Sequence, residues 1–144
     1  MNKRPYAALL LCAFASSAFA GPRCDRETTQ GSWVYTCEGT LPAPAQTATR
    51  LLGRCTASRS GYFNCEGNVK LGGTIIPQLL QGQANNNPNC TGRIIYAQTL
   101  GGAPAGPLDI QYVISEKGDA INGLPTNSGG VLSCRLVRIG NGGD

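Results

Sequence analysis

The sequence contains no histidine, and this absence weakens several kinds of chemistry at once. Neither a Ser-His nor a Cys-His nucleophile pair can form, and no histidine general base is available. Zinc is disfavoured too, because no two cysteines have the spacing of two to four residues found in structural zinc sites. We therefore expect a non-enzymatic protein without a metal or a cofactor.

Charge is also scarce, since charged residues make up 14% of the chain and the formal net charge is +4. Lys3 and Arg4 contribute two of these positive charges, and the other basic residues are scattered. The nearest approach to a basic patch is Arg50, Arg54 and Arg59, which we interpret as a solvated strand face. The sequence therefore offers no basic stripe for binding a nucleic acid.

Long hydrophobic runs are missing, and the one near the N-terminus is too short to span a membrane. It covers residues 7–14, follows Lys3 and Arg4, and precedes the small-residue pattern Ala18-Phe19-Ala20. This order is typical of a secretory signal that is cleaved before Gly21. We expect residues 1–20 to be a signal peptide and residues 21–144 to be a single domain, secreted or periplasmic.

Cysteine, by contrast, is plentiful. Cleavage of the signal removes Cys12 and leaves six cysteines. An even number of cysteines in an exported chain predicts a disulfide framework in an oxidising compartment. The six residues are Cys24, Cys37, Cys55, Cys65, Cys90 and Cys134.

A short segment bracketed by cysteines occurs twice. Residues 24–39 end in Cys37-Glu38-Gly39, and residues 55–67 end in Cys65-Glu66-Gly67. Each copy carries a glycine near its middle and aromatic residues just before its closing cysteine. We interpret the copies as two β-hairpins, each closed by its own disulfide.

Hairpin geometry gives both copies the same register. With Gln30-Gly31 as a two-residue turn, Cys24 faces Cys37 at a position without backbone hydrogen bonds, where side chains approach most closely. With residues 59–61 as a three-residue loop, Cys55 faces Cys65 in the same way. By exclusion, Cys90 then pairs with Cys134.

The rest of the chain also favours short strands. Residues 108–115 alternate clearly, with Leu108, Ile110, Tyr112 and Ile114 on one face. Residues 93–100 and 131–139 are further expected strands, and residues 74–80, interrupted by Pro77, are expected to be an edge strand or an irregular segment. A polar loop is expected over residues 81–89 and a glycine-rich loop up to residue 130. The prediction is an all-β, disulfide-stapled sandwich or barrel of about seven to eight short antiparallel strands, with the two hairpins at its N-terminus.

The aromatic residues of the hairpins are the best indication of function. If their faces point outward, they offer a platform for stacking on sugars or for anchoring a protein. If they point inward, they are core, which is the more common fate of a single tryptophan in a small domain. Arg26, expected opposite Tyr35, favours partial exposure. The candidate ligand-binding residues are Trp33, Tyr35, Tyr62, Asn85, Asn86 and Asn87.

Two partial resemblances accompany these motifs. The hairpin with Gln30-Gly31-Ser32 at its tip and Cys-Glu at its end resembles the hairpins of cyanovirin-type lectins, although the two copies lie closer together than in that family. Residues 35–39, Tyr-Thr-Cys-Glu-Gly, are similar to a Tyr-x-Cys segment of periplasmic inhibitors of c-type lysozyme, whose Ser-Gly-x-x-Tyr loop is absent here. Each resemblance covers under a fifth of the chain.

These observations favour an exported, non-enzymatic binding module that recognises a glycan or cell-envelope polysaccharide. The alternative is a secreted or periplasmic inhibitor or immunity protein that uses its hairpin tips to block a hydrolase such as lysozyme. A structural component of an envelope or appendage is a third possibility. Catalysis by Glu38 and Glu66 requires the two hairpins to bring these carboxylates together, and exposed strand ends are their simpler interpretation.

Overall fold

The computed structural model describes residue 21 and residues 23–41 and 47–141, so the expected signal peptide over residues 1–20 lies outside the described residues. One short 3-10 helix, η1, spans Glu27–Thr29. The strands are β1 (Gly31–Thr40), β2 (Ala48–Ala57), β3 (Tyr62–Leu71), β4 (Thr74–Asn86), β5 (Thr91–Leu100), β6 (Ala103–Ile114), β7 (Ala120–Pro125) and β8 (Val131–Gly140).

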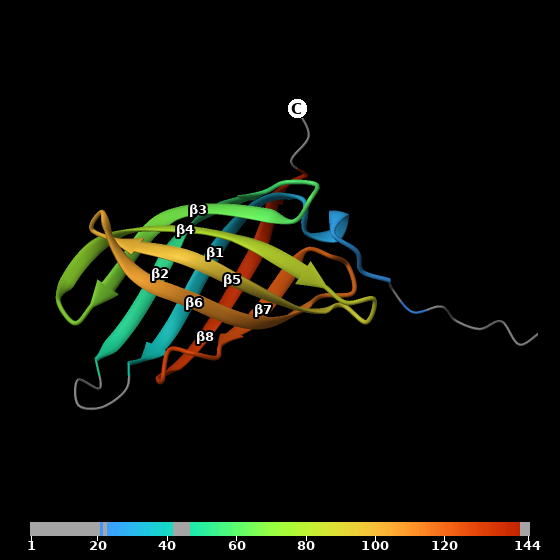
Figure 1. Cartoon of the computed structure of the whole chain (residues 1–144). Helices are drawn as coiled ribbons and strands as arrows, with labels where there is room; N and C mark the ends of the chain where they lie inside the picture. Colours follow the sequence, from blue (N-terminus) through green and yellow to red (C-terminus); the bar gives the residue numbers. More distant parts are fainter. Residues whose placement is uncertain (1–20, 22, 42–46, 142–144) are drawn as a thin grey trace, which may run out of the picture.

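Each strand pairs antiparallel with the next, and β8 returns to pair with β1, which closes the sheet into a barrel (Figure 1). The expectation of a small all-β protein with seven to eight antiparallel strands is therefore confirmed, in its barrel form. Closure gives each of the eight strands a hydrogen-bonded neighbour on both sides, so none of them is an edge strand along its whole length.

Alternation along the strands fills the barrel. Leu108, Ile110, Tyr112 and Ile114 of β6 all point inward and are buried, as their predicted common face requires. Leu132, Cys134 and Leu136 of β8 do the same, and the alternate residues of that strand point outward. The core is therefore the interior of the barrel.

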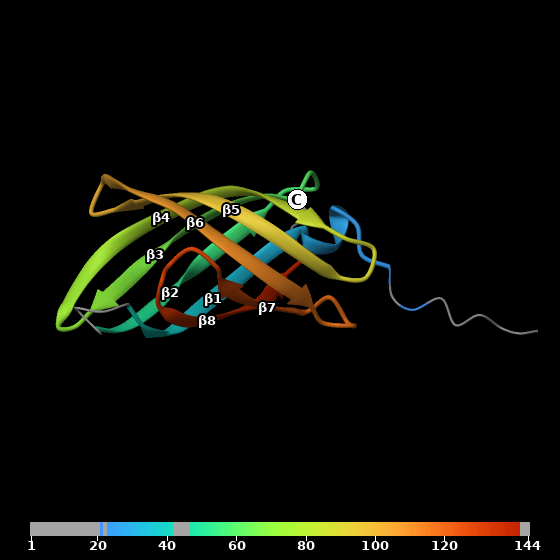
Figure 2. The same ribbon diagram turned by 60° about the horizontal axis from the view of Figure 1, so that its bottom comes forward.

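The two ends of the barrel differ. Residues 24–30, including η1, lie at one end, together with the loops after β2, β4 and β6 (Figures 1 and 2). We call this the strapped end, and residues 24–30 the strap. The turns after β3 and β5 and the loop over residues 126–130 lie at the other end, which we call the cavity end.

The second predicted hairpin is confirmed in register. Cys55 faces Cys65, Ala57 faces Phe63, and the Ser58 amide donates to the Tyr62 carbonyl over 2.9 Å. Gly61 has a φ of 82°, the left-handed conformation expected of the third loop residue. Cys55 and Cys65 form a disulfide.

The first predicted hairpin is wrong. Asp25 accepts hydrogen bonds from the amide and the hydroxyl of Thr28, and the Thr28 hydroxyl accepts one from the Asp25 amide. These local bonds compete with strand pairing and wind the chain into η1. Gly31, expected in the turn, instead begins β1 with a φ of 134°.

Two of the predicted disulfides are accordingly wrong. Cys37 bonds to Cys134, its direct cross-strand partner on β8, and Cys24 bonds to Cys90 in the loop after β4. The exclusion argument failed because barrel closure gives β1 a second neighbour that is distant in sequence. The three bridges together are compatible with an extracellular or otherwise oxidising compartment.

Two segments that were predicted as loops contain strands. β4 continues through Gln81 to Asn86, because Gly82 and Ala84 supply small inward residues and the polar side chains point outward. β7 lies within the glycine-rich segment and contributes buried Ile121. No helix among the residues described here has the length and apolar character needed to cross a membrane.

We predict that peptide mapping under non-reducing conditions will recover Cys37 linked to Cys134. In urea unfolding, replacing both of these cysteines by serine should cost about 1–2 kcal/mol more than replacing Cys55 and Cys65, because the sequence separations are 97 and 10 residues. Both pairs are buried, so the second is a matched control. Equal losses would contradict the assignment of a long-range bridge.

Candidate functional site

The residues predicted to bind a ligand do not form one surface. Trp33 is 0% exposed and Tyr35 is 3% exposed, so both rings belong to the barrel core. Tyr62 points outward from β3 and is 43% exposed. Asn85, Asn86 and Asn87 lie where β4 reaches the strapped end.

Trp33 connects the core to the strap. Its indole Nε1 donates to the Thr29 carbonyl over 2.9 Å, and the Arg138 guanidinium lies 4.4 Å from the ring centroid. An arginine therefore does lie over one of the two aromatic rings, but the pair is Arg138 and Trp33 and not the expected Arg26 and Tyr35. The expected partner of Tyr35, Arg26, precedes η1 and is exposed.

Arg138 binds the backbone of the strap and of the loop after β6. Its Nη2 donates to the Thr28 carbonyl over 2.6 Å and to the Gly118 carbonyl over 2.8 Å, and its Nη1 donates to the Gln30 carbonyl. Burial lowers the pKa of the guanidinium from its usual value. One cation thus satisfies carbonyls from two segments that have no sheet partner there.

Further contacts fasten the strap to the barrel. The Cys24–Cys90 bridge ties its beginning to the loop after β4. Asn86 donates to the Asp25 carbonyl and accepts from the Tyr112 hydroxyl, so its amide joins the strap to the core. Asn87 donates to the Thr91 hydroxyl over 3.0 Å. These two asparagines have structural contacts that their predicted role in ligand binding did not include.

We predict that Arg138→Leu will destabilise the protein by about 2–3 kcal/mol, because three carbonyls lose a charged donor and Trp33 loses its cation. Because Trp33 is buried, we expect its fluorescence to be blue-shifted in the native protein. In the variant, iodide should begin to quench this fluorescence at lower denaturant concentrations than in the wild type. Arg135→Leu, on the outer face of the same strand, is the matched control and should change stability little. Equal effects of the two substitutions would contradict this role.

The cavity end holds a cavity of about 300 Å³, which we call the mouth cavity. It reaches the surface, because Ala105 and Pro107 line it and are exposed. Its polar lining consists of Thr49, Gln98, Asn127 and Ser128, without a charged side chain. Its apolar lining consists of Leu41, Leu51, Val69, Leu71, Leu100, Ala105, Pro107, Leu108, Pro125, Leu132 and Cys134.

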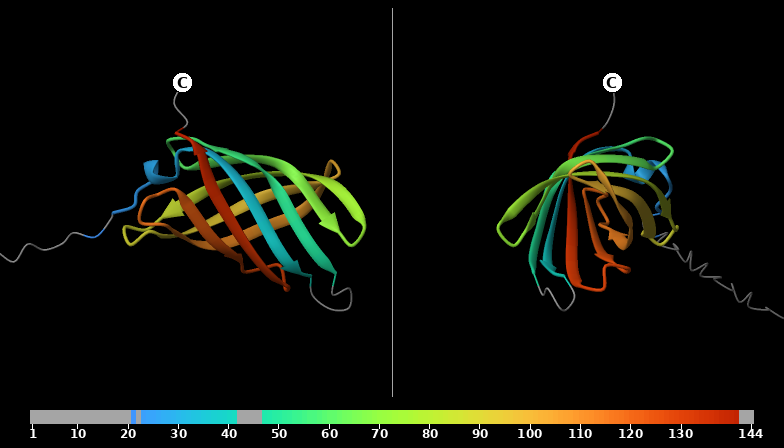
Figure 3. Two further views of the ribbon diagram at one scale, coloured as in Figure 1. Left: turned by 180° about the vertical axis from the view of Figure 1, so that it is seen from behind. Right: turned by 60° about the vertical axis from the view of Figure 1, so that its left-hand side comes forward.

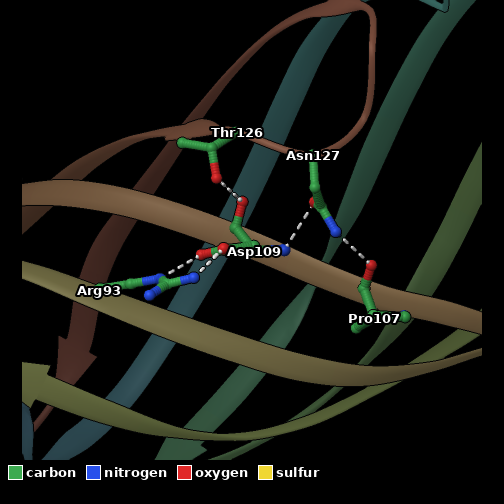
Figure 4. A network of polar contacts seen from close by, with 5 residues as sticks. All are labelled: Arg93, Pro107, Asp109, Thr126 and Asn127. Carbon is green, nitrogen blue, oxygen red and sulfur yellow. Dashed lines mark hydrogen bonds and ion pairs between the residues drawn. The ribbon is translucent and has the colours of Figure 1, made fainter.

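A polar network fixes one side of this cavity (Figure 4). Asn127 donates to the Pro107 carbonyl over 2.8 Å and accepts from the Asp109 amide over 2.9 Å. The Thr126 amide donates to the Asp109 carbonyl over 2.7 Å. Arg93 forms two hydrogen bonds to the Asp109 carboxylate and holds the pKa of that group below its usual value. The loop after β7 is thereby held against β6.

A polar pair lies within the otherwise apolar interior. Tyr35 crosses from β1 over Gly53 and Gly67, and its hydroxyl donates to Gln78 Oε1 on β4 over 3.0 Å. A Cβ at Gly53 or Gly67 would lie 2.6 or 2.5 Å from the Tyr35 Oη, so both positions require glycine. Backbone oxygens would be closer still, since the Glu66 carbonyl oxygen lies 2.3 Å from a Cβ at Gly53 and the Leu52 carbonyl oxygen lies 2.3 Å from one at Gly67.

We predict that stability will fall above about pH 10, since burial raises the pKa of Tyr35 and of Tyr112 to about 12 and raises that of Tyr96 as well. A raised pKa favours the protonated folded state. This contribution to stability is complete below the unfolded pKa and is lost as the pH rises from about 10 to about 12.

Urea unfolding at a series of pH values, followed together with tyrosinate absorbance, tests this prediction. A Tyr35→Phe and Tyr112→Phe double variant should show a weaker pH dependence. Reversible ionisation of every tyrosine at pH 10 in the folded protein would contradict it.

A broad groove of about 610 Å³ crosses the outer surface of strands β5 to β8. Asn87 lines it, and so do amides, hydroxyls and an arginine from neighbouring strands. The residues with polar side chains are Asn87, Thr91, Arg93, Gln111, Asn122, Thr126 and Ser133, in addition to buried Tyr112. This groove suits hydrogen bonding better than stacking, since Tyr112 is the aromatic residue in its lining and is buried.

The carboxylates Glu38 and Glu66 are not brought together. They lie on the outer faces of β1 and β3, with β2 between them, and pair in register with Arg50 and Arg54 respectively. Within the part of the chain that the structure describes, no three histidine, cysteine, aspartate or glutamate residues group as a metal site would require. The mouth cavity differs from the groove in that its lining contains no charged side chain.

Sequence reasoning missed Gln78 and Arg138. Both interrupt an apolar stripe: Gln78 lies between Ile76 and Leu80, and Arg138 follows Leu136, in each case at inward positions. A polar residue in the inward register of an apolar strand was the available signal in both cases.

In comparisons with known proteins, no protein family and no curated protein matches this chain.

Proposed function

We propose that this protein is an exported, non-enzymatic module that binds a small, neutral, mainly apolar molecule in the mouth cavity. The observation that carries the proposal is the contrast between the two ends of the barrel. One end is tied by a disulfide, an arginine and an asparagine, and the other holds an apolar cavity of about 300 Å³ that reaches the surface.

The size and the lining of the cavity support a small-molecule ligand. Ligand pockets are mostly apolar, carry a few polar groups that fix orientation, and measure about 300–1,000 Å³, so this cavity lies at the small end of the range. An eight-stranded barrel has an interior just wide enough for side chains or for one small ligand. In this barrel, buried side chains fill the part of the interior toward the strap, and the mouth cavity lies at the opposite end.

Burial of Trp33 and Tyr35 argues against a glycan as the ligand. Sugar recognition through stacking needs exposed rings, and these two lie inside the barrel. The protein is still proposed to be a binding module, but its ligand is a small, mainly apolar molecule and not a glycan. Ligand selection then depends on Gln98 and Ser128 in the cavity lining and not on the aromatic hairpin.

Inhibition of a hydrolase is the second candidate, favoured by the rigid tip after β2. Cys55–Cys65 closes its base, Gln83 Nε2 donates to the Ser60 carbonyl over 2.6 Å, and Arg59 remains largely exposed while it contacts Glu27. Such pre-organisation lowers the entropic cost of entering a cleft. An inhibition assay with lysozyme is the direct measurement for this candidate.

We predict that the protein will bind the neutral fluorescent probe N-phenylnaphthylamine saturably, with one site per chain. Ala105→Trp should weaken binding by about tenfold or more, equivalent to about 1.4 kcal/mol, because the indole fills the entrance of the mouth cavity. Fluorescence titration measures the dissociation constant of the probe for the wild type and for the variant. Ala97→Trp, at an exposed position of β5 outside the cavity lining, is the matched control. No saturable binding, or equal affinities of the two variants, would refute the proposal.

A further inference from the structure

Three of the four polar side chains that line the mouth cavity are hydrogen-bonded within the protein. The Thr49 hydroxyl donates over 3.1 Å to the backbone carbonyl two residues earlier, and the Ser128 hydroxyl makes a longer contact of 3.4 Å with the Gly130 carbonyl. Asn127 uses both its amide oxygen and its amide nitrogen on the backbone of β6 (Figure 4). The fold therefore already uses these three groups.

Gln98 is the fourth polar side chain of the lining, and the fold does not use it. It is half-buried, and its amide makes no hydrogen bond within the part of the chain that the structure describes. A primary amide has an acceptor oxygen and two N–H donors in one plane. A ligand can therefore pair with this donor and this acceptor without breaking a contact of the fold.

A β-bulge sets the position of Gln98. The register of β5 with β6 shifts between Ala97 and Thr99, so that Gln98 lies opposite two residues of β6, Ala105 and Gly106. Gly106 has a φ of 81°, a left-handed conformation that glycine adopts readily. Bulges of this kind re-aim side chains and are common beside functional sites.

The side chain of Gln98 points into the barrel close to the entrance of the cavity. Its β4 partner, Leu80, is buried in the core, and directly paired residues of neighbouring strands lie on the same face of a sheet. Across the bulge, Ala105 lines the cavity and is exposed, and the turn between β5 and β6 lies at the cavity end (Figure 3, right-hand view). Leu51 and Val69, which also line the cavity, are buried. The unused amide thus lies near the entrance, and the apolar lining extends into the interior.

We propose that the ligand of the mouth cavity is a small amphiphile with a primary carboxamide as its head group, which donates to and accepts from the Gln98 amide. This inference rests on the proposed function and names the chemical class of its ligand. Two amides can pair side by side through two N–H···O bonds, one in each direction. The head group is neutral, because the lining offers no charged side chain to pair with an ion. The apolar tail lies against the buried leucine and valine side chains.

The test compares octanamide with the methyl ketone in which a methyl group replaces the amide nitrogen, each displacing N-phenylnaphthylamine from the mature protein. Both compounds have the same tail and a carbonyl, and octanamide alone has a donor. Gln98→Met keeps the length of the side chain and removes its amide. We expect this variant to bind octanamide about tenfold more weakly and the ketone no more than about threefold more weakly.

Gln111→Met is the matched control, because Gln111 is an exposed glutamine of β6 that lines the outer groove and not the cavity. It should change neither affinity. Urea unfolding gives a second measurement. Since the Gln98 amide makes no hydrogen bond in the fold, Gln98→Met should not lower the unfolding midpoint, whereas a purely structural role predicts that it does. Should Gln98→Met fail to fold, Gln98→Ala replaces it in the same comparison.

The outcomes separate the two proposals. If Gln98→Met weakens both compounds equally or not at all, the carboxamide inference is overturned and the cavity remains a ligand site. The same holds if the probe binds the wild type but octanamide does not displace it, or if Gln111→Met produces the same selective loss. If the probe itself does not bind the wild type, the proposed function fails and the inference fails with it.

Discussion

Pairing of β1 with β8 is the constraint on which most of the structure depends. It closes the barrel, places Cys37 directly opposite Cys134, and carries Arg138 to the ring of Trp33. Arg138 in turn holds the carbonyls of the strap, so one strand pairing decides how the first residues of the domain are fixed. Without this closure, β1 and β8 would be open edges with unpaired backbone groups.

How far the sequence predicts this fold depends on the range of each interaction. Alternation along β6 and β8 and the hairpin of β2 and β3 depend on neighbours within about ten residues, and these were predictable from pattern and turn chemistry. Cys24 had an equally plausible local partner in Cys37. The competing bonds between Asp25 and Thr28 decided against that hairpin, and Cys24 instead bonds to Cys90 in the loop after β4, which lies at the same end of the barrel.

The candidate site was less predictable for a related reason. Trp33 and Tyr35 occupy the same face of β1, but the strand sequence alone does not decide whether that face points into the barrel or out of it. The mouth cavity draws its lining from strands β2, β3, β5, β6, β7 and β8, from Leu41 after β1 and from the loop after β7, so no contiguous segment could reveal it. What the sequence did offer was two polar residues, Gln78 and Arg138, in inward positions of apolar strands.

The polar groups of these two residues differ in how far the fold satisfies them. Arg138 brings a charge to the strapped end and finds carbonyls for it, so its polarity stabilises the fold. Gln78 brings an amide into the interior, where its Oε1 accepts from Tyr35 and its Nε2 has no hydrogen-bond partner among the described residues. An apolar residue at position 78 would remove the unsatisfied donor.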